Sequence, residues 1–338
     1  MKSGISGTRF AGVGFDFKKE EKVRNKTLLT VFGLCLFIPG ILMGQSTIYL
    51  EDSGNYEGAF ANFRIDARAL AMGGAYTSLS DGATAFYWNP GGLGYSKGKE
   101  IAGMYERLYG LINSGYVAFG QGNSKKGEGY SIAWFNTSAS IEDSIGYSEN
   151  SIYIGYGKQA SKKFSFGGTL KGLFVSSGFE NGGGSGFGLN LGASIRPTPQ
   201  TKFGVAIRDL LTRVNWETER KDRLPGDVGI GGSFAPVRPT PKSPYPKVTI
   251  SGEISGGEEK PFKRFSLGVE GWAVEKILAL RGGFSRNFDA LARNAFSLGM
   301  GIQFDAGSAH YYLDIAAVMD SEMDNLGTSP LISAGGRF

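Results

Sequence analysis

The side chains that carry out chemistry in most enzymes are scarce in this sequence. The one histidine, His310, follows Ser308 by two residues in a predicted turn, which is weak geometry for a nucleophile and its base. No Gly-x-Ser-x-Gly motif is present to expose a catalytic serine. The one cysteine, Cys35, excludes an internal disulfide and any cysteine-rich metal site. We therefore predict a protein that is not an enzyme and uses neither metal nor cofactor, with a hydrolase as a minor alternative.

Two other segments contain residue types that bind ligands or partners in other proteins. The acidic residues of 320–325 lack the spacing of a calcium loop, which favours a solvated acidic loop. The segment 209–225 is the longest predicted connection. It contains Arg213, Trp216 and Arg220, residue types that anchor protein interfaces. This segment either contacts a partner or folds down over the body of the protein.

Composition points away from nucleic acid and towards strands. Glycine accounts for 54 of the 338 residues, and the chain also holds 24 Phe, 15 Tyr and 4 Trp, a combination typical of many strands and turns. Residues 1–44 contain seven basic and three acidic side chains, which leaves 29 basic and 28 acidic ones elsewhere. The net charge of +5 therefore comes mostly from the amino terminus. No basic stripe remains that would bind nucleic acid.

The amino terminus has the pattern of an export signal. A basic stretch at 18–26 precedes an apolar core of about 17 residues, which is shorter than a membrane-spanning helix and ends in small residues. We predict a signal peptide over 1–44, with an atypical or over-long basic region, and the alternative is a retained anchor. Residues 45–98 then form an amino-terminal extension, and 99–338 form the main domain.

The main domain alternates between apolar and small or polar residues. Leu298, Met300 and Ile302 alternate with serine, glycine and glutamine, as expected for a strand with two different faces. About 14 segments share this pattern, and many have the 9–11 residues that a tilted strand needs to cross a bilayer. The predicted strands are 100–106, 115–121, 129–137, 150–158, 163–175, 185–197, 201–209, 226–235, 246–255, 262–272, 276–285, 294–304, 309–318 and 329–338.

Connections and the last residue place these strands in a membrane. Predicted connections are longer after odd-numbered strands than after even-numbered ones, as in outer-membrane barrels. The chain ends in Phe338, which resembles the signal that the barrel assembly machinery reads. We predict an all-β, 14-stranded antiparallel transmembrane barrel, surrounded by lipid in the outer membrane of a Gram-negative-type (diderm) bacterium. A soluble β-domain is the alternative, but its second face would carry more charge.

Residues 63–94 interrupt the strand pattern. The alanine-rich stretch 67–72 favours a short helix that ends at Gly73 and Gly74, and Asn89-Pro90 is typical of a turn. We expect this segment to form a hatch inside the lumen, because about 14 strands enclose more space than their own side chains fill. We also expect Trp88 to pack against the barrel interior.

The same segment resembles the amino-terminal signature of the PorV/PorQ family, within the FadL-like superfamily of outer-membrane barrels. The matching motif residues are Arg68, Met72, Gly73, Gly74, Asp81, Tyr87, Trp88, Asn89 and Pro90. The sequence departs from the family pattern at Asp66, Ala71, Gly82 and Gly91. The resemblance implies a 14-stranded barrel whose hatch plugs the lumen.

The resemblance also implies two competing functions. The first is a non-enzymatic role in surface secretion or attachment of the type IX kind, or as a structural outer-membrane component, with secretion-system proteins or surface cargo as partners. The alternative is passive transport of a hydrophobic small molecule, as in FadL-like proteins. Candidate lining for such a molecule is Phe63, Leu70 and Phe86. An outer-membrane hydrolase remains the minor alternative.

Overall fold

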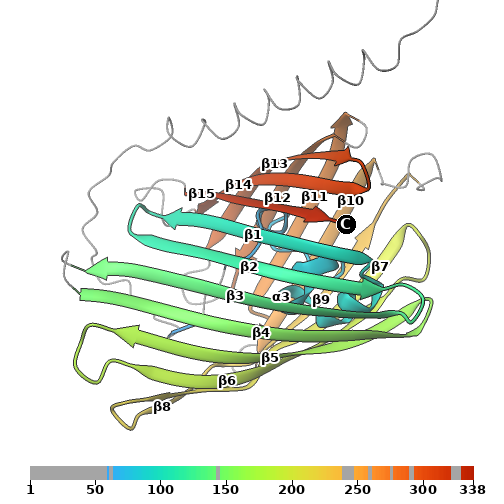
Figure 1. The fold of residues 1–338 in the computed structure, drawn as a ribbon. Helices are drawn as coiled ribbons and strands as arrows, with labels where there is room; N and C mark the ends of the chain where they lie inside the picture. The colour runs from blue at the N-terminus through green and yellow to red at the C-terminus, as the bar shows by residue number, and fades with distance from the viewer. Residues whose placement is uncertain are drawn as a thin grey trace, which may run out of the picture. The chain divides into compact units, whose positions relative to one another are not determined.

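The computed structural model describes residues 59–60, 64–141, 145–237, 247–257, 261–274, 277–288, 293–320 and 329–338. The predicted signal peptide, Cys35, Phe63 and most of the acidic segment 320–325 lie outside these residues. All described residues belong to one compact unit, Ile48–Phe338. Within it, a closed antiparallel barrel surrounds several short helices (Figure 1).

The barrel wall consists of 14 strands among the described residues. Each wall strand is hydrogen-bonded to the wall strands before and after it in the chain, including β6 to β7. The first strand, β1, also pairs with the last, β15, which closes the sheet. The short β8 pairs with β7 as a hairpin beyond the ring. The strands are β1 (Gly98–Leu108), β2 (Ile112–Asn123), β3 (Glu128–Ile141), β4 (Ile145–Ser161), β5 (Phe164–Ser177), β6 (Gly184–Ile195), β7 (Thr201–Trp216), β8 (Lys221–Arg223), β9 (Asp227–Phe234), β10 (Val248–Gly257), β11 (Arg264–Val274), β12 (Leu278–Asn287), β13 (Asn294–Ala306), β14 (Ala309–Asp320) and β15 (Pro330–Arg337).

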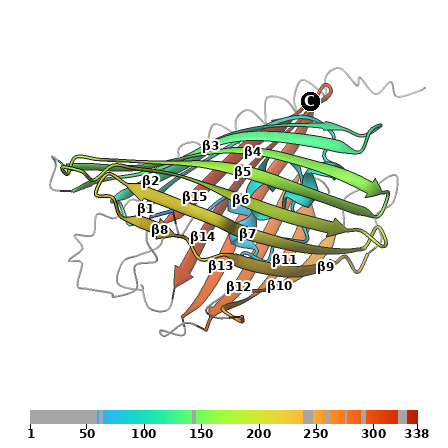
Figure 2. The ribbon, with the colours of Figure 1, turned by 90° about the horizontal axis from the view of Figure 1, so that it is seen from below.

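The two ends of the barrel differ in what they hold. One end, here called the carboxyl end, contains Phe338 and the tight turns 124–127, 162–163 and 307–308. The opposite end, here called the far end, contains the hairpin of β7 and β8, which Figure 2 shows away from the C mark. The two-residue turns 162–163 and 307–308 both lie at the carboxyl end, and short turns face the periplasm in outer-membrane barrels, so we expect this end to be the periplasmic one.

All 14 predicted wall strands are present, but several extend further than their alternation indicated. Strand β4 runs from Ile145 to Ser161, well beyond the predicted 150–158, because polar residues continue the pairing with β3. Far-end connections such as 109–111 are correspondingly short. The prediction of a long loop at 209–225 was wrong, since most of it forms β7 and β8.

An irregularity in β7 explains that error. Asp209 and Leu211 both have a φ of 57°, a left-handed conformation that is uncommon outside glycine, and the register against β6 shifts beside them. Asp209 forms an ion pair with Lys171, and its backbone N–H donates to Asn190 Oδ1 at 3.0 Å. The strand bulges here and then resumes, which alternation alone does not reveal.

The two faces of the wall are inverted relative to a soluble protein. Small and polar side chains point inward and are buried, including Ser131, Ser151, Thr169, Asn190, Ser266, Ser297 and Ser333. Large apolar side chains point outward and are exposed, including Ile101, Val117, Ile132, Ile154, Leu170, Phe187, Ile230 and Leu298. This is the arrangement of a barrel whose outer surface contacts lipid.

Residues 64–97 form the hatch. It contains α2 (Ala67–Ala71), η2 (Gly82–Thr84), α3 (Ala85–Trp88) and η3 (Pro90–Tyr95), which lie inside the ring of strands in both views (Figures 1 and 2). No helix among the described residues is long and apolar enough to cross a membrane.

Local sequence explains how the hatch folds. The Asp66 carboxylate accepts a hydrogen bond from Arg68 N at 3.0 Å and caps α2, while Gly73 and Gly74 end it with positive φ. Asn89 Oδ1 accepts from Gly91 N at 3.0 Å and starts η3.

Candidate functional site

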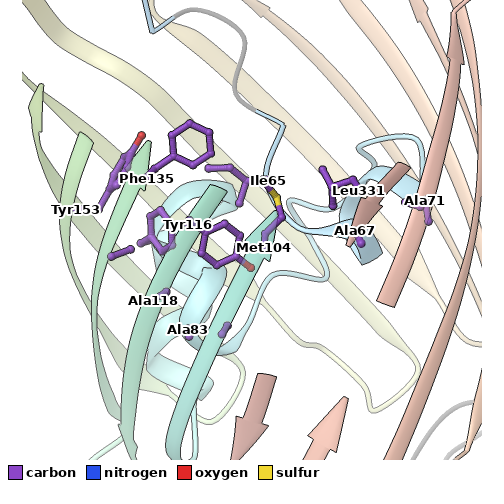
Figure 3. Packing of buried hydrophobic residues seen from close by; sticks show 14 residues of the cluster. Ile65, Ala67, Ala71, Ala83, Met104, Tyr116, Ala118, Phe135, Tyr153 and Leu331 are labelled. Atoms are coloured by element: carbon purple, nitrogen blue, oxygen red, sulfur yellow. The ribbon is translucent and has the colours of Figure 1, made fainter. Parts of the chain in front are cut away.

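On one side of the lumen, the hatch packs against apolar side chains of the barrel wall. Phe86 has no exposed surface, and its ring centroid lies 6.3 Å from that of Tyr116 and 4.8 Å from that of Tyr153. Figure 3 shows this cluster, in which hatch side chains meet wall residues of β1 to β4 and of β15. Leu70 is half-buried against the same cluster. Of the three residues expected to line a ligand cavity, Phe86 is packed core in this structure, Leu70 is half-buried beside it, and Phe63 lies outside the described residues.

Close backbone contacts explain glycines on both sides of the boundary between hatch and wall. A Cβ at Gly73 would lie 2.7 Å from the carbonyl oxygen of Phe284, and one at Gly268 would lie 2.9 Å from Met72 Cβ. A Cβ at Gly91 would meet Ala193 Cα at 2.8 Å. These separations are shorter than van der Waals contact, so side chains here would push the hatch off the wall. The small wall residues thus accommodate the hatch itself.

Two wall carboxylates bind the hatch backbone. Glu253 accepts hydrogen bonds from Tyr76 N at 3.0 Å, from Thr77 N at 2.9 Å and from Thr77 Oγ1 at 2.8 Å. Glu100 accepts from Ala83 N at 2.9 Å and from the Tyr312 hydroxyl at 2.9 Å. Irregular backbone buried in a barrel needs partners for its N–H groups, and charged acceptors form the strongest such bonds.

Arg68 of the hatch motif belongs to a buried ion-pair network. Its Nε and Nη2 atoms each lie 2.8 Å from a carboxylate oxygen of Glu270, a bidentate arrangement. Arg281 Nε lies 2.8 Å from the same carboxylate, and Arg281 Nη1 lies 2.5 Å from Asp314 Oδ1. Because this network joins α2 to β11, β12 and β14, it fixes the hatch to one part of the wall.

A second ion-pair cluster lies on β7. Arg208 Nη2 is 2.6 Å from Asp227 Oδ2 and 3.5 Å from Glu253 Oε1, and Arg208 Nη1 is 3.4 Å from the Trp88 carbonyl oxygen. Trp88, which we expected to pack against the barrel interior, is buried, and its apolar cluster mates are hatch residues. Its ring belongs to a cluster within the hatch, where it is 5.7 Å from the Tyr76 ring, and its Nε1 donates to Ile65 O at 3.1 Å.

Among the other motif residues, Met72 and Tyr87 pack within the hatch, and Asn89 links the hatch to the wall. Met72 is buried in the same cluster as Trp88, and Tyr87 packs between that cluster and the one around Phe86. Burial raises the pKa of Tyr87 to about 12. Asn89 Nδ2 donates to Thr77 O and to Ala193 O, each at 2.9 Å, and so links hatch and wall. Most motif residues are thus placed at hatch–hatch or hatch–wall contacts.

A cavity of about 540 Å³ lies beside the hatch at the carboxyl end. Its lining includes Asp81 of the motif, which lies 3.6 Å from Arg337 Nη2 and 3.7 Å from Arg196 Nη2. Burial alone would raise the pKa of Asp81, but Arg337, Lys202 and other cations outweigh it and hold that pKa at about 2. The cavity is polar and charged, which differs from the apolar pocket that a hydrophobic ligand requires.

An apolar cluster surrounds Phe60 at the far end of the barrel. Phe60 is buried, and its backbone N–H donates to Glu149 Oε2 at 3.0 Å. The ring of Trp216 packs against this cluster while its Nε1 donates to Asp222 Oδ2 at 2.8 Å. The rest of the cluster is Ala59, Tyr147, Leu173, Val175, Val214 and Leu224. The far end of the lumen is therefore apolar, unlike the carboxyl end.

The remaining predicted residues lie apart from the hatch. Arg213 is exposed on β7, and Arg220, at the tip of the hairpin, is 72% exposed and pairs with Asp222 at 2.7 Å. His310 contacts Asp305 at 2.7 Å and Gln303 at 3.2 Å. No group of side chains among the described residues is arranged to hold a metal ion.

Several site residues were missing from the sequence-based candidates. These are the wall charges Glu100, Arg208, Glu253, Glu270, Arg281 and Asp314. A signal for them existed, because Glu270 and Arg208 fall on the small, polar face of alternating strands. A charge at an inward position of a barrel strand indicates a buried partner. The sequence of that strand does not identify the partner, which is on the hatch or on another strand.

Comparison with known proteins supports the fold. No protein-family model and no curated protein matches the sequence. Among solved structures, the CymD monoaromatic hydrocarbon channel has a TM-score of 0.57 at 12% identity, covering 80% of this chain and 97% of its own. The Pseudomonas putida toluene transporter TodX has a TM-score of 0.53 at 12% identity, with coverage of 79% and 96%.

A Pseudomonas aeruginosa FadL homologue gives the same picture, with a TM-score of 0.58 at 9% identity and coverage of 83% and 99%. At these identities the likeness concerns the fold. Together with the inverted faces of the wall, it shows that this chain is a 14-stranded antiparallel barrel of the outer membrane with the architecture of FadL-like proteins.

Proposed function

We propose that the protein is a passage for small hydrophobic molecules across the outer membrane, closed at rest by its hatch. The observation that carries this proposal is that apolar side chains from two clusters lie on the inner face of four neighbouring strands. Val175 and Leu173 belong to the far-end cluster, and Tyr153, Phe135 and Tyr116 belong to the cluster around Phe86. They lie on β5, β4, β3 and β2 in that order. We call these five residues the apolar track.

The chain itself now occupies this track. Phe60, Ile65 and Phe86 pack against it and are each less than 5% exposed. An apolar guest that follows the track therefore takes the place of apolar side chains, and it gains from leaving water. The similarity to a hydrocarbon channel and a toluene transporter supports a guest of this class.

Whole-cell uptake tests the proposal. Cells of a diderm host that express the protein should take up labelled toluene faster than cells without it, with no change for glucose. Val175→Asp places a charge on the track and should lower toluene uptake about tenfold. Leu111→Asp is the matched control, because Leu111 is exposed in a far-end turn and should leave uptake unchanged. Equal uptake by both variants at equal protein levels would exclude the track as the route.

A docking role in surface secretion is the second candidate, as the PorV/PorQ motif implies. One observation favours it, namely the exposed Arg220 at the tip of the β7–β8 hairpin. Removal of the gene should then leave secreted proteins off the cell surface, and Arg220→Glu should reproduce that loss. Normal surface proteins in both strains would leave transport as the sole candidate.

A further inference from the structure

The cavity at the carboxyl end has a composition that the proposed passage does not explain. It lies on the side of the hatch away from the apolar track, and charged residues dominate its lining. The cationic lining residues are Arg68, Lys97, Arg196, Lys202, Arg281 and Arg337. The anionic ones are Asp66, Asp81, Glu100, Glu270 and Asp314.

Ion pairing leaves positive charge in excess at one part of this lining. Glu270 and Asp314 balance Arg68 and Arg281, and Glu100 lies 3.2 Å from Arg337 Nε. The Asp81 carboxylate then faces the remaining cations, and its shortest ion pairs measure 3.6 and 3.7 Å, beyond hydrogen-bond length. One loosely held carboxylate thus faces both Arg196 and Lys202.

Donors without partners also line the cavity. Among the described residues, Arg196 Nε and Nη2 are buried atoms with no hydrogen-bond partner. The Arg196 guanidinium lies 3.9 Å from the Tyr95 ring centroid, which fixes its plane. On another side, Gln303 is only 7% exposed, and its Nε2 has no hydrogen-bond partner either. Buried donors of this kind are costly unless something accepts from them.

We propose that this cavity binds an oxyanion, a carboxylate or phosphate group, among Arg196, Lys202 and Arg337. A planar guanidinium donates two parallel hydrogen bonds to such a group, and a lysine adds a point charge. The bound oxyanion competes with the carboxylate of Asp81 for the same cations. Because Asp81 belongs to the hatch, the anion replaces one contact that joins hatch and wall. The binding itself is independent of the proposed hydrocarbon passage.

Calorimetric titration of the purified full-length barrel with inorganic phosphate at low salt tests the site. Binding should be saturable in the wild type. Arg196→Gln and Lys202→Gln should each weaken it about tenfold or more, since each removes a charged donor. Asp81→Asn should strengthen it because the internal competitor is gone. Lys163→Gln, at an exposed turn of the same end, is the matched control and should bind like the wild type.

Two further arms settle the source of the oxyanion and the folding of the variants. Acetate and a short-chain phosphatidylglycerol, titrated in the same way, separate a free anion from a lipid headgroup. The slower gel migration of boiled protein confirms that each variant was folded. Equal affinity in wild type, Arg196→Gln and Lys202→Gln would overturn the site, as would absence of saturable binding in both wild type and Asp81→Asn. Toluene uptake is measured separately from anion binding. One proposal can therefore be disproved while the other stands.

Discussion

The hatch contacts two very different parts of the barrel wall. On β1 to β4 it packs against Met104, Tyr116, Phe135 and Tyr153, here called the apolar wall. On β10 to β14 it meets Glu253, Glu270, Arg281 and Asp314, here called the charged wall. The same short segment therefore uses burial of apolar surface on one side and directional polar contacts on the other.

The two walls hold the hatch by different physics. Apolar packing is non-directional and grows with the area removed from water, so it fills space without fixing one exact position. Buried ion pairs depend on geometry, and losing one partner leaves an uncompensated charge in a medium that solvates it poorly. We infer that the apolar wall fills the lumen, whereas the charged wall determines where the hatch sits and when it leaves.

The largest effect should come from removing the hatch and with it both contacts. Deletion of residues 64–92 should leave a barrel that inserts but has an open lumen, because side chains of 14 strands do not fill it. Conductance in planar bilayers should rise by an order of magnitude or more. A folded deletion barrel with wild-type conductance would show that the hatch is not a plug.

The next largest effect should come from the charged wall. Glu270→Gln leaves Arg68 and Arg281 facing each other without their shared carboxylate, which costs about 4 kcal/mol. We expect a lower melting temperature together with bursts of conductance, since the hatch loses its anchor. Glu128→Gln is the control, because its partner Lys158 is exposed and the pair lies outside the lumen. Bursts in both variants would argue against a specific anchor.

The apolar wall should respond differently. Phe86→Ala removes a fully buried ring between Tyr116 and Tyr153 and should cost about 3 kcal/mol. The melting temperature should fall while conductance stays at the closed level, because the ion pairs still hold the hatch. Phe296→Ala, whose side chain is 56% exposed on the outer face, should change neither in detergent. Conductance bursts in Phe86→Ala would erase the proposed difference between the walls.

Much of the barrel was predictable because alternation with a period of two is local. All 14 wall strands were expected, and the apolar faces were correctly assigned to one side. Strand ends were less predictable, since β4 continues through polar residues that pair without changing the pattern. The bulge at Asp209 was unpredictable because its contacts are with Asn190 on β6 and Lys171 on β5, which are distant in sequence.

The site was predictable only in part. The motif containing Arg68 and Asp81 indicated a hatch, and the structure shows both residues at hatch–wall contacts. Their partners, such as Glu270 at a distance of 202 positions in sequence, depend on barrel closure, which one strand cannot specify. Phe86 shows a different limit, because the sequence pattern of an aromatic side chain is the same whether it lines a cavity or packs in a core.

The smallest predicted effect concerns Asp66, which lies near Arg68 and Arg281 of the charged network but also near Asp314. Burial, with Asp314 second, raises the pKa of Asp66 from 3.8 to about 6. A carboxyl whose pKa is higher in the folded state binds its proton more tightly there, so its contribution to stability is greatest below about pH 4 and is lost as the pH rises through 6. Between pH 5 and pH 8 this amounts to about 1 kcal/mol.

Asp66→Asn keeps an oxygen to cap α2 and cannot titrate, so its melting temperature should change less than that of the wild type over this range. Glu180→Gln, an exposed loop carboxyl, should follow the wild type. A parallel pH dependence in Asp66→Asn would mean that the Asp66 carboxyl is already charged at pH 5, and that the charged wall extends to the cap of α2.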